Sequence, residues 1–577
     1  MAKGGSVKVS EGVWFLIVAV IATTLALTIV SLANSNDTST LVEKVNTEST
    51  EMITMIKSLV NPVEAFSVWA DSDLGDDSNA GTSAGSPVKT LQRAIEVLET
   101  TVAADSCMIY LSGISPFYLG NGTTLDFSVV ERRCQKVVIK GTRENVVSDT
   151  VAALNPIEPF GAWSNVVGES GNYAEDYTEH FVENLDRGYV YVVRNNSAGD
   201  FDTIAGDVDN IPSFDVDRKS WVVGERYELF KVSTTITWIG DLDLVIPKAG
   251  EFLIFDSLIL DPEEDESPWN NPFGFESFVE FRGCRMITKS TTSGTYRGSM
   301  YLRGVFIDGM TNVLFNSDLY DSRLRAISVW SQSAGINWSG DGYACFVYAT
   351  QGTFVTLTST AGFFAGYGLF IEDPTDWGLQ LINALTFRVA RVKITGIKNF
   401  DRGVLLQSSQ GLINFIDIRG DNNAFGIVAI QTDMRLSGFN QDINYIECGR
   451  PILLEDDAHV SAFGTDLITT TGAGVAGGIR VRWGSKFTII STMTITSTSN
   501  AVPVISETGS TVLIKGGLTV TSDTFAYRVG RGSTIQWVVQ SPNQGTGPDI
   551  DFCTLGSTAH PVDTIHDPVW ECYFTRI

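Results

Sequence analysis

The sequence is poor in charge, and especially in positive charge. Charged residues make up only 19% of the 577 residues, with 40 lysines and arginines against 67 aspartates and glutamates, so the net charge is −27. A chain this acidic repels the phosphates of nucleic acids, and we therefore expect no DNA or RNA partner. The excess acid is typical of a long, solvated surface.

Histidine and cysteine motifs are also lacking. The four histidines are scattered, at His180, His459, His560 and His566. The seven cysteines form no Cys-x-x-Cys pair, which argues against zinc, and we expect no cofactor. Cys553 and Cys572 flank a C-terminal segment and are a candidate disulfide; the alternative is that all seven cysteines are buried thiols.

What the sequence does contain is a repeat in its C-terminal third. Six similar blocks start at intervals of 23, 25, 27, 24 and 24 residues. They lie at 403–408, 426–431, 451–456, 478–483, 502–507 and 526–531. A second column of apolar segments follows at 412–417, 435–440, 459–464, 486–491, 510–515 and 534–539. Short β-rich blocks at this period predict a solenoid, in which each coil must stack on its neighbours to bury its apolar face.

An uncharged stretch near the N-terminus predicts a membrane anchor. It begins at Val13 and Trp14, ends at Ala33, and its 21 residues are long enough to cross a bilayer as a helix. Lys3 and Lys8 precede it, which favours an internal N-terminus with the remaining chain outside. The alternative is a cleaved signal peptide, because the stretch ends in small residues.

A heptad pattern follows the apolar stretch. Its a and d positions are Val42, Val45, Ser49, Met52, Ile56 and Leu59. This seam predicts a short self-associating stalk, for which we favour a homotrimer. The alternative is one amphipathic helix that lies on the membrane or on the next domain.

The segment 67–98 carries the most specific motif. A polar, glycine-rich loop leads to Pro87, to Thr90 as a candidate N-cap, and to a helix whose apolar face is Leu91, Ala94, Ile95 and Leu98. Such a helix can cover the open end of a β-stack. The motif residues are Asp77, Asn79, Gly81, Thr82, Ser83, Pro87, Lys89, Thr90, Leu91, Gln92, Ala94 and Ile95.

This motif resembles the opening of right-handed parallel β-helix proteins of the pectate-lyase-like superfamily. The resemblance implies an all-β, right-handed parallel β-helix over most of 65–540. It implies little about function, because the superfamily holds lyases, hydrolases, epimerases, phage tailspikes and structural proteins.

The expected domain plan follows the chain in order. It consists of an internal tail (1–12), a transmembrane helix (13–33), a heptad stalk (34–64), the first coils with their capping helix (65–140), irregular coils or an inserted side domain (141–280), regular coils (281–540) and a C-terminal cap (541–577).

Catalytic motifs of the superfamily's enzymes are missing. The chain has no Gly-His-Gly, and Arg391 and Lys393 match the Arg-Ile-Lys motif of polygalacturonase-like hydrolases only loosely. We name no catalytic residue. The carboxylates Asp417, Asp421, Asp442 and 455–457 are candidate calcium ligands or solvated turn residues. The tryptophans Trp330, Trp338 and Trp377 are candidates for stacking on sugars or for packing under loops.

Four sequons, at Asn36, Asn121, Asn195 and Asn337, are candidate glycan sites on an exported chain.

Taken together, anchor, stalk and solenoid favour a structural surface protein. We expect a spike or minor capsid protein of a membrane-containing virus, with neighbouring capsid proteins and host glycans as partners. The alternatives are a membrane-tethered polysaccharide lyase or glycoside hydrolase, and a cellular adhesin. Carboxylates from adjacent coils that meet beside a basic or aromatic residue would favour the enzyme.

Overall fold

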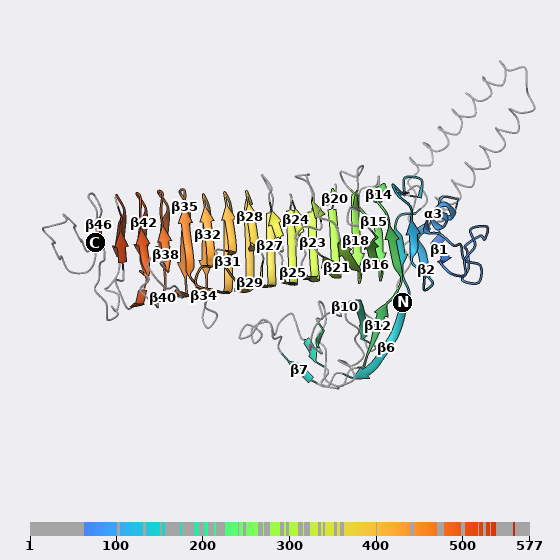
Figure 1. The fold of residues 1–577 in the computed structure, drawn as a ribbon, viewed down its shortest axis with the longest axis horizontal. Coiled ribbons are helices and arrows are strands. Elements are labelled where there is room, and N and C mark those ends of the chain that lie inside the picture. Colours follow the sequence, from blue (N-terminus) through green and yellow to red (C-terminus); the bar gives the residue numbers. More distant parts are fainter. Residues whose placement is uncertain are drawn as a thin grey trace, which may run out of the picture.

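The computed structural model of the chain is an elongated stack of parallel β-strands (Figure 1). It describes residues 63–100, 104–130, 134–150 and 226–240, isolated strands within 153–214, most of 242–537 with gaps at turns, and residues 558–559. Within these residues, no helix combines the length and apolar character that crossing a bilayer requires. The expected membrane segment (13–33) and heptad seam (42–59) lie outside the described residues, as do Cys553 and Cys572.

The fold is an all-β parallel solenoid, as the repeat predicted. Most of its strands belong to one 25-stranded sheet. Up to the middle of the chain these are β1 (Val63–Asp71), β2 (Ala104–Ser112), β3 (Phe117–Leu119), β5 (Val137–Lys140), β13 (Thr235–Trp238), β15 (Gly250–Asp256), β16 (Ile259–Pro262), β18 (Ser277–Arg282), β19 (Arg285–Thr288), β21 (Ser299–Gly309), β23 (Arg323–Gln332), β25 (Asp341–Thr350), β27 (Phe363–Glu372) and β29 (Thr386–Ile397). They continue as β31 (Gln410–Gly420), β33 (Asp433–Ser437), β34 (Asn444–Cys448), β36 (His459–Phe463), β37 (Thr465–Thr469), β39 (Lys486–Ile489), β40 (Met493–Ser497), β42 (Thr511–Ile514), β43 (Leu518–Ser522), β45 (Thr534–Trp537) and β46 (Thr558–Ala559).

A second sheet of nine parallel strands closes the coils on another side. Its strands are β24 (Ile336–Trp338), β26 (Val355–Leu357), β28 (Trp377–Ile382), β30 (Arg402–Gln407), β32 (Phe425–Ile430), β35 (Arg450–Glu455), β38 (Ile479–Val481), β41 (Val504–Ser506) and β44 (Tyr527–Val529). Shorter strands lie on the earlier coils: β4 (Thr124–Asp126), β14 (Leu242–Val245), β17 (Trp269–Asn270), β20 (Gly294–Thr295) and β22 (Phe315–Asn316). The six repeated sequence blocks overlap β30, β32, β35, β38, β41 and β44, so the sequence repeat corresponds to strands of the nine-stranded sheet.

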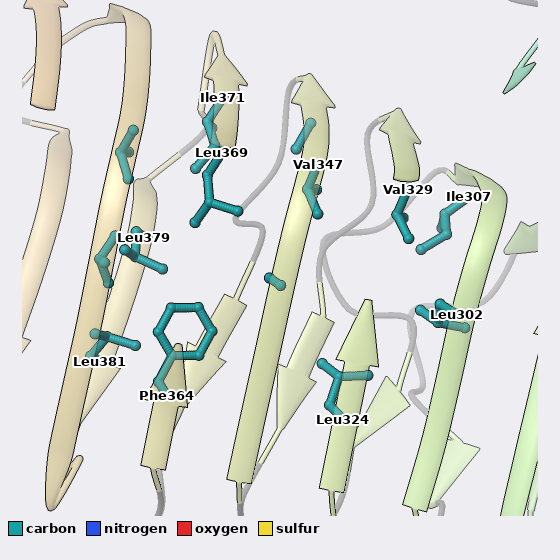
Figure 2. Close-up of a cluster of buried hydrophobic side chains, with 14 of the residues drawn as sticks. Leu302, Ile307, Leu324, Val329, Val347, Phe364, Leu369, Ile371, Leu379 and Leu381 are labelled. Carbon is teal, nitrogen blue, oxygen red and sulfur yellow. The ribbon is translucent and has the colours of Figure 1, made fainter. Parts of the chain in front are cut away.

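Aliphatic side chains stack in columns inside the solenoid. Register pairs Val305 with Val329, Val347 and Leu369 on successive coils, and all four are buried. Figure 2 shows this part of the core, with Leu379 and Leu381 of the nine-stranded sheet facing the same interior. Each such side chain contributes about 1.5–3 kcal/mol to stability on burial, so neighbouring coils stabilise one another.

The corners after six strands of the nine-stranded sheet, β28, β30, β32, β35, β38 and β41, each have a left-handed residue that is not glycine. These residues are Asn383, Ser408, Gln431, Asp456, Trp483 and Thr508, with φ between 48° and 56°. Hydrogen bonds between coils hold the corner, for example from Ser408 N to Ile430 O (2.9 Å). Buried hydroxyls one or two positions after the corner residue add further bonds between coils. Ser409 Oγ accepts from Ala384 N (3.0 Å), and Ser485 Oγ accepts from Ala458 N (3.1 Å). These bonds satisfy amides that the bend would otherwise leave buried and unpaired.

The N-terminal motif caps the stack as expected. Helix α3 (Leu91–Glu99) packs its buried face, which includes Leu91, Ala94, Ile95 and Leu98, against β1 and β2. Thr90 is its N-cap, since its side chain accepts from Arg93 N (3.2 Å). Gly81 has φ +69°, and a Cβ there would lie 3.0 Å from the Val88 side chain, which accounts for a glycine at this position.

A small antiparallel sheet projects from the solenoid between β5 and β13. Its strands are β6 (Arg143–Thr150), β9 (Val190–Asn195), β10 (Phe201–Ala205) and β12 (Arg226–Val232), in the order β10-β9-β12-β6. Beside it lie β7 (Ala153–Asn155), β8 (Tyr173–Glu175) and β11 (Ser213–Phe214). Figure 1 shows β6 and β12 leaving the solenoid together, and β10 packs against β21. Arg143, the first residue of β6, connects this sheet to the solenoid, because it donates hydrogen bonds to Asp256 Oδ1 (2.7 Å) and Ser257 Oγ (2.7 Å).

The structure pairs two cysteines that no sequence motif links. Cys107 of β2 and Cys134 form a disulfide, so the alternative of seven buried thiols is wrong. Cys284 and Cys448 are buried free thiols, and burial raises the pKa of each to about 12.

Candidate functional site

The outward surface of the nine-stranded sheet, here called the nine-stranded face, carries an alternating column of aromatic and arginine side chains. Register aligns Trp377, Arg402, Phe425 and Arg450 on four successive coils. The Arg402 guanidinium lies 4.2 Å from the Trp377 ring centroid, and Arg450 lies 4.6 Å from that of Phe425. Cation–π attraction of this kind fixes both partners and leaves charge at the surface.

An apolar cluster separate from the main core supports this column. Leu405, Val428 and Leu453 occupy equivalent positions on β30, β32 and β35 and are only 4%, 3% and 7% exposed. Phe425 belongs to the same cluster, and Trp377 packs against it. The aromatic rings are therefore held by packing as well as by the arginines.

Further along, the same face becomes rich in charge. Arg480 lies within β38, and Arg482 follows directly after it. Arg480 forms an ion pair with Glu507 (2.9 Å), and Arg482 forms one with Glu455. Burial lowers the pKa of Arg482, and burial together with the charges of Arg480 and Arg482 lowers the pKa of Arg450. The guanidinium groups of Arg480 and Arg482 are thus close enough to repel that of Arg450.

A column of carboxylates borders the aromatic–arginine column. Asp376 and Asp401 immediately precede Trp377 and Arg402, and backbone bonds stack them, from Arg402 N to Asp376 O (2.8 Å) and from Phe425 N to Asp401 O (2.9 Å). Burial raises the pKa of Asp401, and the charges of Asp376 and Asp421 raise it further. A carboxyl group whose pKa is raised beside other carboxylates can act as a general acid.

Asp421, one of the candidate calcium ligands, has a structural part in its turn. Its carboxylate accepts from Asn423 N (2.7 Å), Ala424 N (3.0 Å) and Asn399 N of the preceding coil (3.2 Å). It thereby links two coils. No group of three or more potential metal ligands is found among the described residues.

Asp417, another candidate calcium ligand, belongs to a network on β31 and β34 of the larger sheet. Arg419 bonds Asp417 (3.0 Å) and lies 5.0 Å from the Tyr445 ring, while Tyr445 donates to Glu447 (2.7 Å). Burial, followed by the bond to Glu447, raises the pKa of Tyr445 to about 12. The network joins the two strands and engages both carboxylates.

The other candidate carboxylates do not gather at one point. Glu455 is paired with Arg482, whereas Asp456 and Asp457 are exposed in the following turn with positive φ. Asp442 lies outside the described residues.

The remaining candidates are spread over the molecule. His459 is exposed on β36, and His180, His560 and His566 lie outside the described residues. Arg391 is a buried, left-handed residue of β29 that lies 5.6 Å from the Tyr367 ring, and Lys393 follows on the same strand. Trp330 and Trp338 lie on β23 and β24.

The sequons occupy different places. Asn121 is exposed in the turn after β3, Asn195 ends β9, Asn337 lies within β24, and Asn36 is outside the described residues.

The sequence pointed to Trp377 but not to its arginine partners. A signal for them was present, because Arg402, Phe425 and Arg450 each stand directly before one of the repeated blocks. When the residues directly before the blocks are aligned with one another, they predict a column in which arginine and aromatic side chains alternate.

Comparison with known proteins yields only distant similarity. No protein-family model matches the chain, and no curated protein matches it. Among solved structures, XylC in complex with xylose matches with 9% identity and a TM-score of 0.19 over 73% of this chain and 83% of that chain. The tailspike gp49 from Pseudomonas phage LKA1 matches with 11% identity and a TM-score of 0.18, over 82% of this chain and 75% of its own. The Pseudomonas phage phi297 tailspike gp61 matches with 10% identity and a TM-score of 0.19, over 82% and 78%. Similarity at this level carries no argument about function, so the function of this chain is inferred from its own residues.

Proposed function

We propose that the chain is a rigid surface protein that projects from a membrane and attaches to saccharides through its outward faces. The observation that carries the proposal is the column Trp377–Arg402–Phe425–Arg450, which repeats a ring or a charge on successive coils of one rigid stack. Strands stack at roughly 4.8 Å, so a linear polymer that lies along the solenoid meets Trp377, Arg402 and Arg450 on different coils, with the buried Phe425 ring (9% exposed) between the two arginines. Many weak contacts then add up to firm attachment.

Features elsewhere in the chain support a projecting, exported protein. The Cys107–Cys134 disulfide is typical of an oxidising compartment. The apolar segment 13–33 and the seam at 42–59 precede the first coil, where an anchor and a trimeric stalk would place the solenoid outside the membrane. The N-terminal motif with its capping helix supports the finer assignment to right-handed, pectate-lyase-like β-helices.

Within this proposal, the most specific role is that of a virion spike or minor capsid protein. Such a protein needs an anchor, an oligomeric stalk and a stiff projection, and this chain combines sequence features for all three. Neighbouring capsid proteins and host glycans are the proposed partners.

The decisive experiment measures the native mass of the full chain in detergent micelles by light scattering with correction for bound detergent. Three times the chain mass of 62.7 kDa is expected. A monomer would contradict the stalk. Binding of the same sample to immobilised polysaccharides, with a neutral dextran among them, tests the attachment role separately.

A second function is favoured by Asp401. Its raised pKa beside Asp376 and Asp421 is the arrangement that a polysaccharide hydrolase or lyase would use, with Trp377 and Arg402 alongside. If the chain is such an enzyme, it releases new reducing ends from a polysaccharide, with or without calcium, and Asp401→Asn abolishes the release. If neither acidic nor neutral polysaccharides release new reducing ends, the enzymatic function is rejected and only the attachment role remains.

A further inference from the structure

Exposed apolar side chains gather on the first coils of the solenoid. Among the described residues, nine large hydrophobic side chains are exposed, and four of them lie within residues 63–140 at the N-terminal end of the stack (Figure 1). These four are Leu74, Ile114, Tyr118 and Val129, whereas the other five are spread over residues 343–490. Ile114 is 97% exposed and Leu74 is 84% exposed. Single exposed hydrophobic residues are common on soluble proteins, but a group of them marks a contact surface.

Hydrogen bonds hold Leu74 and Ile114 at one corner of the first coil. The carboxylate of Asp73 accepts from Ile114 N (2.5 Å), and Leu74 is the next residue of the same turn. Ser72 Oγ donates to Ser115 O (2.6 Å), so the turn after β1 is bonded directly to the turn after β2. Both aliphatic side chains therefore project into solvent from a fixed backbone.

The outward surface of β1 and β2 adds aromatic side chains to this corner. Val68 and Ala70 of β1 are buried in the core, so Trp69 between them faces outward. Its partner in register on β2 is Tyr110, and the two rings stack with their centroids 5.5 Å apart. The hydroxyl of Tyr110 contacts the sulfur of Met108 (3.3 Å), and these three side chains are partly exposed. The first coil thus presents apolar groups both along its strands and at their ends.

The segment that precedes β1 favours a second copy of the chain as the partner for this surface. The heptad seam ends at Leu59, and β1 begins at Val63. Four backbone steps span at most about 14 Å, so copies joined by the seam hold their first coils next to one another. Copies linked in this way meet at an effective concentration in the millimolar range, at which a small apolar contact is sufficient.

The bilayer is a poorer partner for the same surface. The seam at 42–59 lies between the apolar segment 13–33 and β1, and as a helix it would span about 27 Å. The loop that holds Leu74 is also acidic, because residues 71–90 include four aspartates and one lysine. Anionic lipid surfaces repel such a loop.

We propose that Trp69, Leu74, Tyr110 and Ile114 form a contact between copies of this chain, directly after the stalk. This inference rests on the proposed trimer and extends the contact between its copies from the seam into the solenoid. Such a contact orients the solenoids relative to one another, which a seam that ends before β1 does not do.

The first test measures how readily the full chain dissociates in detergent micelles. Light scattering over a dilution series gives the protein concentration at which half of the trimer has dissociated. For Leu74→Ser/Ile114→Ser we expect this concentration to rise at least tenfold. The matched control Leu385→Ser/Ile490→Ser removes a leucine and an isoleucine that are exposed on later coils, and it should change the concentration less than twofold. Thermal unfolding of each variant shows that it is folded.

Photo-cross-linking identifies what covers the corner. Ile114 is replaced by the photoreactive amino acid p-benzoylphenylalanine, and isotope-labelled and unlabelled full chains are mixed in phosphatidylcholine vesicles. Mass spectrometry of the linked peptides should show residue 114 attached to residues 63–140 of another chain, with labelled and unlabelled peptides joined. The same amino acid at Leu385, which is 64% exposed, is the control and should give no link between chains.

Several outcomes would overturn the inference while the trimer itself stands. A link from residue 114 to residues 42–59 would show that the seam covers the corner, and a link to lipid would show that the bilayer does. Absence of any link, or equal dissociation of the double variant and its control, would show that the corner lies outside the contact between copies. A parent chain that is monomeric at every concentration would reject the proposed stalk, and this inference with it.

Discussion

The carboxylate of Asp77 holds Thr90 at the start of the capping helix. Asp77 Oδ1 accepts from the backbone N of Thr90 (2.9 Å), and Oδ2 accepts from its hydroxyl (3.1 Å). Asp77 also accepts from Lys89 N (2.8 Å), and Asn79 donates to Pro87 O (2.8 Å). The polar loop thus positions the N-cap and with it the helix that covers the first coil.

Replacing Asp77 should loosen this cap. Asp77→Ala removes acceptors for two backbone amides and should cost about 1 to 2 kcal/mol. The effect should be local, because a solenoid opens from its ends. Hydrogen exchange in the native state should therefore show faster exchange of the α3 amides with little change in β37 or β40.

The control for Asp77 is Glu96→Ala on the same helix. Glu96 makes an exposed i, i+3 pair with Arg93, which contributes only about 0.2–0.5 kcal/mol. If the α3 amides exchanged at the same rate in both variants, the polar loop that contains Asp77 would have no role in capping the helix.

Asn444 is expected to be the most sensitive polar residue of the regular coils. It is fully buried, its Oδ1 accepts from Ile416 N (3.2 Å), and its Nδ2 donates to Gly464 O (3.2 Å). Asn444→Ala leaves the buried Ile416 amide without this acceptor, at a cost of about 1 to 3 kcal/mol, whereas Gly464 O keeps its bond from the backbone N of residue 444 (3.1 Å). Urea unfolding of this variant and of Asn422→Ala, an exposed turn residue, provides the comparison; equal midpoints would contradict the prediction.

The disulfide should stabilise the first coils. Cys107 and Cys134 are separated by 27 residues, and closing a loop of that size contributes about 3 kcal/mol. Cys107→Ser/Cys134→Ser should therefore unfold at lower denaturant concentration. Alkylation of the unfolded, unreduced chain should leave both residues unlabelled while Cys284 and Cys448 are labelled; label on Cys107 would show that the bridge is absent.

The sequence predicted the solenoid because apolar blocks recur wherever a strand faces the interior. The blocks at 426–431 and 451–456, for instance, overlap β32 and β35. The corners were harder to predict, since residues such as Gln431 and Trp483 adopt positive φ without being glycine. Bonds to the next coil, which only pairing reveals, hold them in that conformation.

The candidate site was less predictable than the fold for a related reason. Arg402 meets Trp377, and Arg480 meets Glu507, only after the coils are brought into register. Residues 25 or 27 positions apart then become neighbours. Such pairs can be found in a single sequence only if the residues that flank the repeated blocks are aligned together with the blocks.

Asp401 should make stability depend on pH. Its pKa is raised in the folded chain, first by burial and then by Asp376 and Asp421, so the folded state holds the proton more tightly than the unfolded state does. Stability is therefore lost as pH rises from the ordinary aspartate pKa through the raised one, and the loss is complete above it. Asp401→Asn cannot ionise, so it should unfold at a higher temperature than the parent near neutral pH and at an equal temperature below the ordinary aspartate pKa. Thermal unfolding across pH, with Asp433→Asn as an exposed control, measures the difference; curves for Asp401→Asn that run parallel to the parent at every pH would show that the pKa of Asp401 is not raised in the folded chain.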